Sequence, residues 1–135
     1  MVLWTTFGLL YAWSILASLW CWVSLSRFLA RYPTLADEGA LGAFKRLARV
    51  NMVLALLQIG VMVSGACVGI LLILRHGVVR GLGAVLLANG IVLALGKILK
   101  PLEARVRSLP AATEALAAEH ARVSETWVSK PFPDF

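Results

Sequence analysis

Two cysteines and two histidines are the side chains of this sequence most readily recruited for metal binding, redox reactions or nucleophilic catalysis. Cys21 and Cys67 are far apart in the chain and belong to no Cys-x-x-Cys pair, so we interpret both as small apolar packing residues. His76 precedes a glycine between two apolar runs, and we interpret it as a polar turn residue, with ligation of a metal, pigment or haem left open. His120 lies in a polar segment near the carboxyl end, and we interpret it as a solvated residue.

Residue sets that would carry catalysis are missing from the sequence. It has no recognisable Ser/His/Asp or Cys/His arrangement, no HExxH segment and no paired carboxylates in a plausible pocket. Gly96 and Lys97 resemble part of a P-loop, but Gly90 precedes them at the wrong spacing and no Ser or Thr follows. We therefore predict that the chain is not an enzyme and that it binds no cofactor.

Charged side chains are also missing from three long apolar runs, at residues 1–26, 50–74 and 81–96. Ionisable residues inside a bilayer are the usual carriers of proton relays, ion sites and gating charge. The sequence therefore argues against a proton-coupled pump or carrier that acts alone. A haem inside the bilayer is disfavoured too, because both histidines lie outside these runs.

The three runs dominate the composition. Hydrophobic residues make up 60% of the chain and charged residues 15%, whereas soluble domains have about 45–50% and about 25%. The mean hydropathy is +0.84. Because about 20 helical residues cross the hydrocarbon core of a bilayer, we predict an all-α integral membrane protein with transmembrane helices at 1–27, 51–75 and 81–99. The first run lacks the basic segment that precedes a signal peptide, so we expect it to be retained.

The 13 basic and 7 acidic residues are distributed unevenly around these helices. The connection between the second and third helices, an external turn at 76–80, is flanked by only Arg75 and Arg80. The other two flanking segments hold Arg27, Arg31, Lys45, Arg46, Arg49, Lys97, Lys100, Arg105 and Arg107. The positive-inside rule then predicts an N-out, C-in, multi-pass protein of the cell (inner) membrane. We expect the basic residues to meet anionic lipid headgroups at the cytoplasmic face rather than nucleic acid.

Two cytoplasmic segments have amphipathic patterns. Within the loop at 28–50, residues 40–50 place apolar side chains on one side of a helix and basic ones on the other, which predicts an interfacial helix in the headgroup plane. The apolar side consists of Leu41, Phe44, Leu47 and Ala48. In the helical tail at 100–135, we predict an amphipathic helix over about 110–128, with Pro110 as its first residue. The last six residues of the tail, 130–135, contain two prolines and are expected to be extended.

Small residues recur at helical spacing within the second and third apolar runs. Such residues let helix backbones approach closely in lipid, where the hydrophobic effect gives helices little reason to associate. The predicted helix-packing residues are Gly65, Gly69, Gly81, Ala84, Ala88, Gly90 and Ala94. Gln58 and Asn89 are the strongly polar residues well inside the runs, and each is expected to find a hydrogen-bond partner there. These faces serve either to pack the three helices together or to bind other subunits.

The function favoured by these observations is that of a non-catalytic accessory or scaffolding subunit. Its partners would be the lipid bilayer and other integral membrane subunits of a respiratory, photosynthetic, transport or secretion complex. Trp127, Phe132 and Phe135 are predicted to dock on a partner at the cytoplasmic face, because stiff, proline-flanked aromatic residues lose little entropy on binding. A self-associating, holin-like membrane pore is one alternative, on topology alone. A cofactor- or quinone-site membrane anchor subunit is the other.

Overall fold

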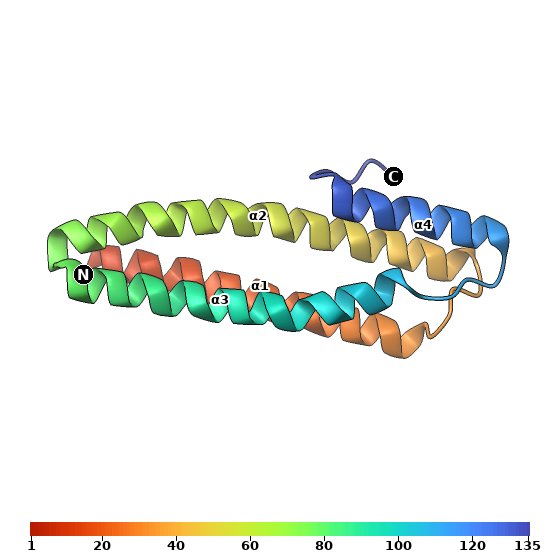
Figure 1. The fold of residues 1–135 in the computed structure, drawn as a ribbon, viewed down its shortest axis with the longest axis horizontal. Helices are drawn as coiled ribbons and strands as arrows, with labels where there is room; N and C mark the ends of the chain where they lie inside the picture. Colours follow the sequence, from red (N-terminus) through yellow and green to blue (C-terminus); the bar gives the residue numbers. More distant parts are fainter.

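The computed structural model describes all residues, 1–135, and is helical apart from its connections, its first residue and residues 130–135. Its helices are α1 (Val2–Arg31), α2 (Glu38–His76), α3 (Val78–Arg107) and α4 (Glu114–Ser129). The first three lie side by side along an elongated bundle, and α4 covers one end of it, against the first turns of α2 (Figure 1). The all-α prediction is confirmed.

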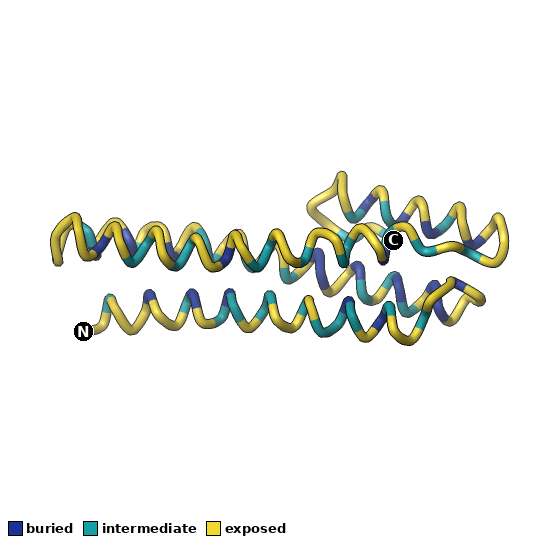
Figure 2. The backbone as a smooth tube through the Cα atoms, turned by 60° about the horizontal axis from the view of Figure 1, so that its bottom comes forward, coloured by how far each residue is buried: buried dark blue, intermediate teal, exposed yellow.

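The three long helices α1, α2 and α3 are each long and apolar enough to cross a membrane, which confirms the prediction of three such helices. Many large apolar side chains of these helices are exposed, where lipid would cover them. Figure 2 shows exposed residues along the whole length of the bundle. The 39 residues of α2 extend over about 58 Å at 1.5 Å per residue, about twice the thickness of the hydrocarbon core. One continuous helix is therefore long enough for both a membrane span and a long extension beyond it.

A single residue, Gly77, joins α2 to α3. Its φ of 90° lies in the region that favours glycine, because a Cβ atom would be strained there. Its N–H donates to the carbonyl of Ile73 at 3.0 Å, and its own carbonyl accepts from the N–H of Gly81 at 3.1 Å. The turn predicted at 76–80 is therefore shorter in the structure, since α2 includes His76 and α3 begins at Val78.

The two connections at the opposite end are fastened to each other. The N–H of Leu35 donates to the carbonyl of Pro110 at 2.9 Å, and the N–H of Ala112 donates to the carbonyl of Leu35 at 3.0 Å. Leu35 is fully buried. Pro110 therefore lies in a connection, and its prediction as the first residue of the last helix is wrong. Helix α4 begins at Glu114, where the side chain of Thr113 caps it.

The segment predicted as an interfacial helix, residues 40–50, belongs to the first turns of α2. The Asp37 side chain caps this end of the helix by accepting a hydrogen bond from the N–H of Ala40 at 2.7 Å. The apolar side of the segment is covered by protein, because Leu41, Phe44 and Ala48 are buried in a cluster with residues of α1, α3 and α4. The apolar side of this segment therefore packs against the chain's own helices.

Two clusters of buried side chains lie at the two ends of the molecule. The larger, which we call the head core, consists of Leu25, Phe28, Leu35, Ala40, Leu41, Phe44, Ala48, Val106, Leu116 and Val123. The smaller, which we call the span core, consists of Phe7, Tyr11, Leu72 and Val92. The part of the molecule around the head core, including α4 and the tail, is called the head below.

Candidate functional site

Three of the predicted helix-packing glycines lie where helices approach each other closely. A Cβ atom on Gly65 would be 3.1 Å from Cε2 of Tyr11, and one on Gly69 would be 2.6 Å from Cγ2 of Val85. A Cβ atom on Gly81 would be 2.6 Å from Cα of Ile73. Gly65 therefore lets α2 approach α1 closely, and Gly69 and Gly81 let α2 and α3 approach each other closely.

The other small residues divide into two groups. Ala84 and Ala88 are half-buried and pack against the span core. Gly90 and Ala94 are exposed, and a Cβ atom on Gly90 would meet no atom within 4 Å. The structure thus gathers Gly65, Gly69, Gly81, Ala84 and Ala88 between its own helices and leaves Gly90 and Ala94 on an outer surface.

Of Gln58 and Asn89, the two strongly polar residues well inside the apolar runs, only Asn89 has side-chain hydrogen-bond partners within the chain. Its Nδ2 donates to Oη of Tyr11 at 2.9 Å and to the carbonyl of Val85 at 2.8 Å. The first of these bonds joins α3 to α1 across the bundle. Neither side-chain polar atom of Gln58 has a hydrogen-bond partner in the protein, although both atoms are buried.

Gln58 lines a mainly apolar cavity of about 180 Å³ between α1, α2 and α3. Ser18, Cys21, Asn51 and Glu103 line the same cavity. Asn51 is 5% exposed, and its Oδ1 has no protein partner, whereas its Nδ2 donates to the carbonyl of Leu47 at 2.9 Å. Because a water molecule takes about 30 Å³ in the liquid, the cavity has room for several waters that would satisfy these groups.

These cavity residues were not predicted as a group from the sequence. The available signal was the spacing of Asn51 and Gln58, which are seven residues apart and therefore share one face of a helix. The contribution of Glu103 could not be found in this way, because it comes from another helix. The assembled amides, carboxyl, hydroxyl and thiol can hold water or a small polar molecule by hydrogen bonds.

The two cysteines and His76 do not form a common site. Cys21 is half-buried and Cys67 is exposed, and both are free thiols. His76 is exposed at the end of α2, with its ring centroid 5.8 Å from that of Trp4. No group of three or more His, Cys, Asp or Glu side chains in the chain could hold a metal ion.

The three aromatic residues predicted to dock on a partner have different surroundings. Trp127 is half-buried, and its ring centroid lies 6.1 Å from that of Phe44 in the head core. Phe135 is also half-buried, and its carbonyl oxygen accepts a hydrogen bond from Nη2 of Arg49 at 2.5 Å. Phe132 is 67% exposed. Trp127 and Phe135 thus contact the chain's own head, and only Phe132 is left mainly on the surface.

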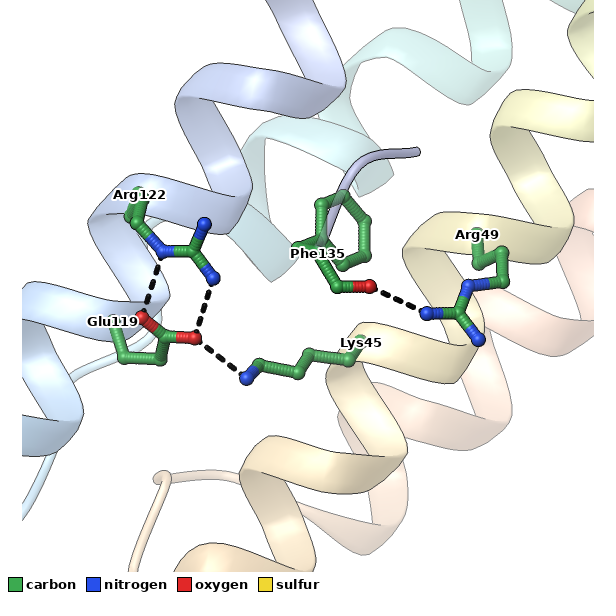
Figure 3. A network of polar contacts seen from close by, with 5 residues as sticks. All are labelled: Lys45, Arg49, Glu119, Arg122 and Phe135. Carbon is green, nitrogen blue, oxygen red and sulfur yellow. Dashed lines mark hydrogen bonds and ion pairs between the residues drawn. The ribbon is translucent and has the colours of Figure 1, made fainter. Parts of the chain in front are cut away.

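A network of polar contacts fastens α4 to α2 (Figure 3). Oε1 of Glu119 lies 2.5 Å from Nζ of Lys45, and both carboxylate oxygens accept hydrogen bonds from Arg122 at 2.8 Å. The hydrogen bonds from Arg122, and then those from Lys45, lower the pKa of Glu119 to about 2. The ion pair is therefore present throughout the physiological pH range, although solvent and salt screen it.

His120 is 5% exposed, so its interpretation as a solvated residue is wrong. Its ring centroid lies 4.5 Å from that of Phe44, and its Nε2 donates to the carbonyl of Val106 at 3.2 Å. Burial disfavours the charged imidazolium and lowers the pKa of His120 from the usual 6.5, while the hydrogen bond to Val106 acts in the opposite direction.

Acidification is expected to loosen the head through His120. Because the pKa of His120 is lower in the folded head than in the unfolded chain, stability falls as the pH drops below about 6.5. Hydrogen exchange of the α4 amides, corrected for intrinsic pH effects, should therefore speed up between pH 7 and pH 5.

The matched variant is His120→Gln, which keeps an N–H donor for Val106 but does not titrate in this range. Glu119 stays ionised between pH 7 and pH 5 because its pKa is about 2, so it does not contribute to the change. Equal pH profiles for the natural chain and His120→Gln would show that His120 is not responsible.

Comparison with known proteins assigns no family to this chain. No protein-family model, curated protein or solved structure matches it. The fold and its contacts define a bundle of three helices able to span a membrane, with a compact helical head at one end. Function is therefore inferred from the residues and their geometry.

Proposed function

We propose that this protein is a non-catalytic accessory or scaffolding subunit of a larger integral membrane assembly. By the positive-inside rule, the basic head lies in the cytoplasm, and the amino terminus and the Gly77 turn lie outside the cell (inner) membrane. The observation that carries the proposal is an outer surface of α3 that bears small residues and has no partner within the chain.

Helix α3 is the least buried of the three long helices. In its most apolar stretch 6% of the residues are buried, against 17% in α1 and in α2. Gly83, Gly90 and Ala94 lie within about 40° of one another around the helix, at 100° per residue. All three are exposed, and a Cβ atom on either glycine would meet nothing within 4 Å. This surface would allow a helix of another subunit to approach closely.

A second contact with a partner is proposed at the head. Phe132 is 67% exposed and Val128 is 65% exposed, so together they offer apolar side chains near the end of the chain. Exposed aromatic residues of this kind are common anchors at protein interfaces. The docking role first predicted for three aromatic residues is now proposed for Phe132 alone, because Trp127 and Phe135 pack against the head core.

Gly90→Leu tests the proposal, because the new side chain points into open space within the isolated chain. We expect folding and membrane insertion to be unchanged, since Leu is favourable in lipid. A branched side chain on the small-residue face should keep a partner helix away, so most co-purifying subunits should be lost from mildly solubilised native membranes. Native mass spectrometry of the solubilised assemblies measures this loss.

Gly8→Leu is the matched control, since Gly8 lies on α1 and a Cβ atom there would also meet nothing within 4 Å. It should leave the assemblies unchanged. If Gly90→Leu retains every partner, the α3 surface faces lipid and the proposal is wrong. If the natural assemblies contain only copies of this chain, and its expression collapses the membrane potential, the pore alternative replaces the accessory subunit.

A further inference from the structure

A groove of about 720 Å³ lies between the end of α1 and the beginning of α2. Arg27 and Arg31 line it from α1, and Arg46 lines it from α2. Gly42 also lines the groove, and a Cβ atom on Gly42 would meet nothing within 4 Å, so the absence of a side chain there leaves the hollow open.

None of the three arginines of the groove takes part in an ion pair. The ion pairs of the chain are Lys45 with Glu119, Arg122 with Glu119, and Lys130 with Asp134. Arg27 and Arg31 are four residues apart and therefore share one face of α1. Guanidinium groups bind phosphate through paired, charge-assisted hydrogen bonds, so three unpaired ones in a groove favour a phosphate-bearing ligand.

The rest of the groove has an apolar lining that reaches the membrane-spanning part of the bundle. Trp20 is 61% exposed and Val50 is 42% exposed, and both line the groove together with Leu47. Trp20 belongs to the uncharged run that ends just before Arg27, and Val50 begins the uncharged run that follows Arg49. The arginines therefore lie where the apolar surface of the bundle ends, which is the level of lipid headgroups.

We propose that this groove is a binding site for an anionic glycerophospholipid. The phosphate would contact Arg27, Arg31 and Arg46, and the acyl chains would lie along Trp20, Leu47 and Val50. Basic pockets between transmembrane helices bind lipid headgroups in this way. A free phosphate ion would use the arginines but leave the apolar lining uncovered, and a zwitterionic lipid would not neutralise the arginines. The lipid would occupy the leaflet on the side of the head.

Native mass spectrometry of the full-length protein in an uncharged detergent tests this site. The protein is titrated with phosphatidylglycerol, phosphatidylcholine or inorganic phosphate, and the fraction carrying one bound ligand gives the apparent affinity. We expect phosphatidylglycerol to bind at least about tenfold more tightly than phosphatidylcholine, because three cationic groups face its headgroup. Inorganic phosphate at millimolar concentration should not displace the bound lipid.

Two variants probe charge and shape separately. The triple variant Arg27→Gln, Arg31→Gln, Arg46→Gln should lower the affinity for phosphatidylglycerol at least about tenfold. Gly42→Leu should also lower it, because the side chain would fill the hollow without changing any charge. The control is Lys97→Gln, Lys100→Gln, Arg105→Gln, which removes the same net charge at exposed positions that do not line the groove. This control should bind nearly as well as the natural chain.

Equal losses in the two triple variants would overturn the proposal, because binding would then depend on net charge alone. Equal affinity for phosphatidylglycerol and phosphatidylcholine would also overturn it. Displacement of the lipid by inorganic phosphate would show that the arginines bind a free anion instead. Binding unchanged by Gly42→Leu would place the lipid elsewhere on the surface.

Discussion

Replacing Gly81 with alanine is expected to disrupt the packing of α2 against α3. The added Cβ atom would lie 2.6 Å from Cα and 2.7 Å from the backbone nitrogen of Ile73. These are backbone atoms within α2, so no side-chain rotation can relieve the clash. Helix α3 cannot simply move away, because Gly77 joins the two helices directly beside this contact. Overpacking of this kind costs about 1–3 kcal/mol or more.

Gly83→Ala is a closely matched control for this substitution. Gly83 is two residues further along α3, and a Cβ atom there would meet nothing within 4 Å. Both variants gain the same helix propensity from the change of glycine to alanine, so that contribution cancels in the comparison. Unfolding in mixed micelles of increasing sodium dodecyl sulfate measures the difference. Equal midpoints for the two variants would contradict the close contact between α2 and α3.

The membrane-spanning helices could be predicted from the sequence, because an uncharged apolar run of this length has few alternatives to a helix that crosses the bilayer. The contacts that these helices make with one another were harder to predict from the sequence. The spacing of Gly65 and Gly69 predicted a face for close contact, but the residues opposite them are Tyr11 and Val85, which are not small. A pattern within one helix shows which face is suited to packing, and does not identify the residue that fills it.

The head was the part of the fold that the sequence predicted least well. The apolar side of residues 40–50 has the same pattern whether lipid or protein covers it, so its burial under α4 could not be read from periodicity. His120 illustrates the same difficulty. A histidine on an amphipathic helix looks solvated unless its neighbours are known, and these are Phe44 from α2 and the carbonyl of Val106 from α3.

The second large effect is expected for Phe44→Ala, which should release α4 from the rest of the head. Phe44 has no exposed surface, and its ring lies among those of Phe28, His120 and Trp127, at centroid distances of 6.2, 4.5 and 6.1 Å. Removing a fully buried aromatic ring costs about 3–5 kcal/mol. Because α4 packs mainly on α2, this loss should be felt most at the contact between these two helices.

The three long helices should remain inserted in Phe44→Ala, since lipid continues to cover their apolar surfaces and their backbone hydrogen bonds stay intact. Hydrogen exchange followed by mass spectrometry should therefore show fast exchange in α4 and unchanged protection in the membrane-spanning parts. Phe132→Ala, at a 67% exposed position, should leave both regions unchanged. Retained protection of α4 would mean that the polar contacts of Glu119 suffice to hold it. Loss of protection in the spans as well would mean that the head and the spans unfold as one cooperative unit.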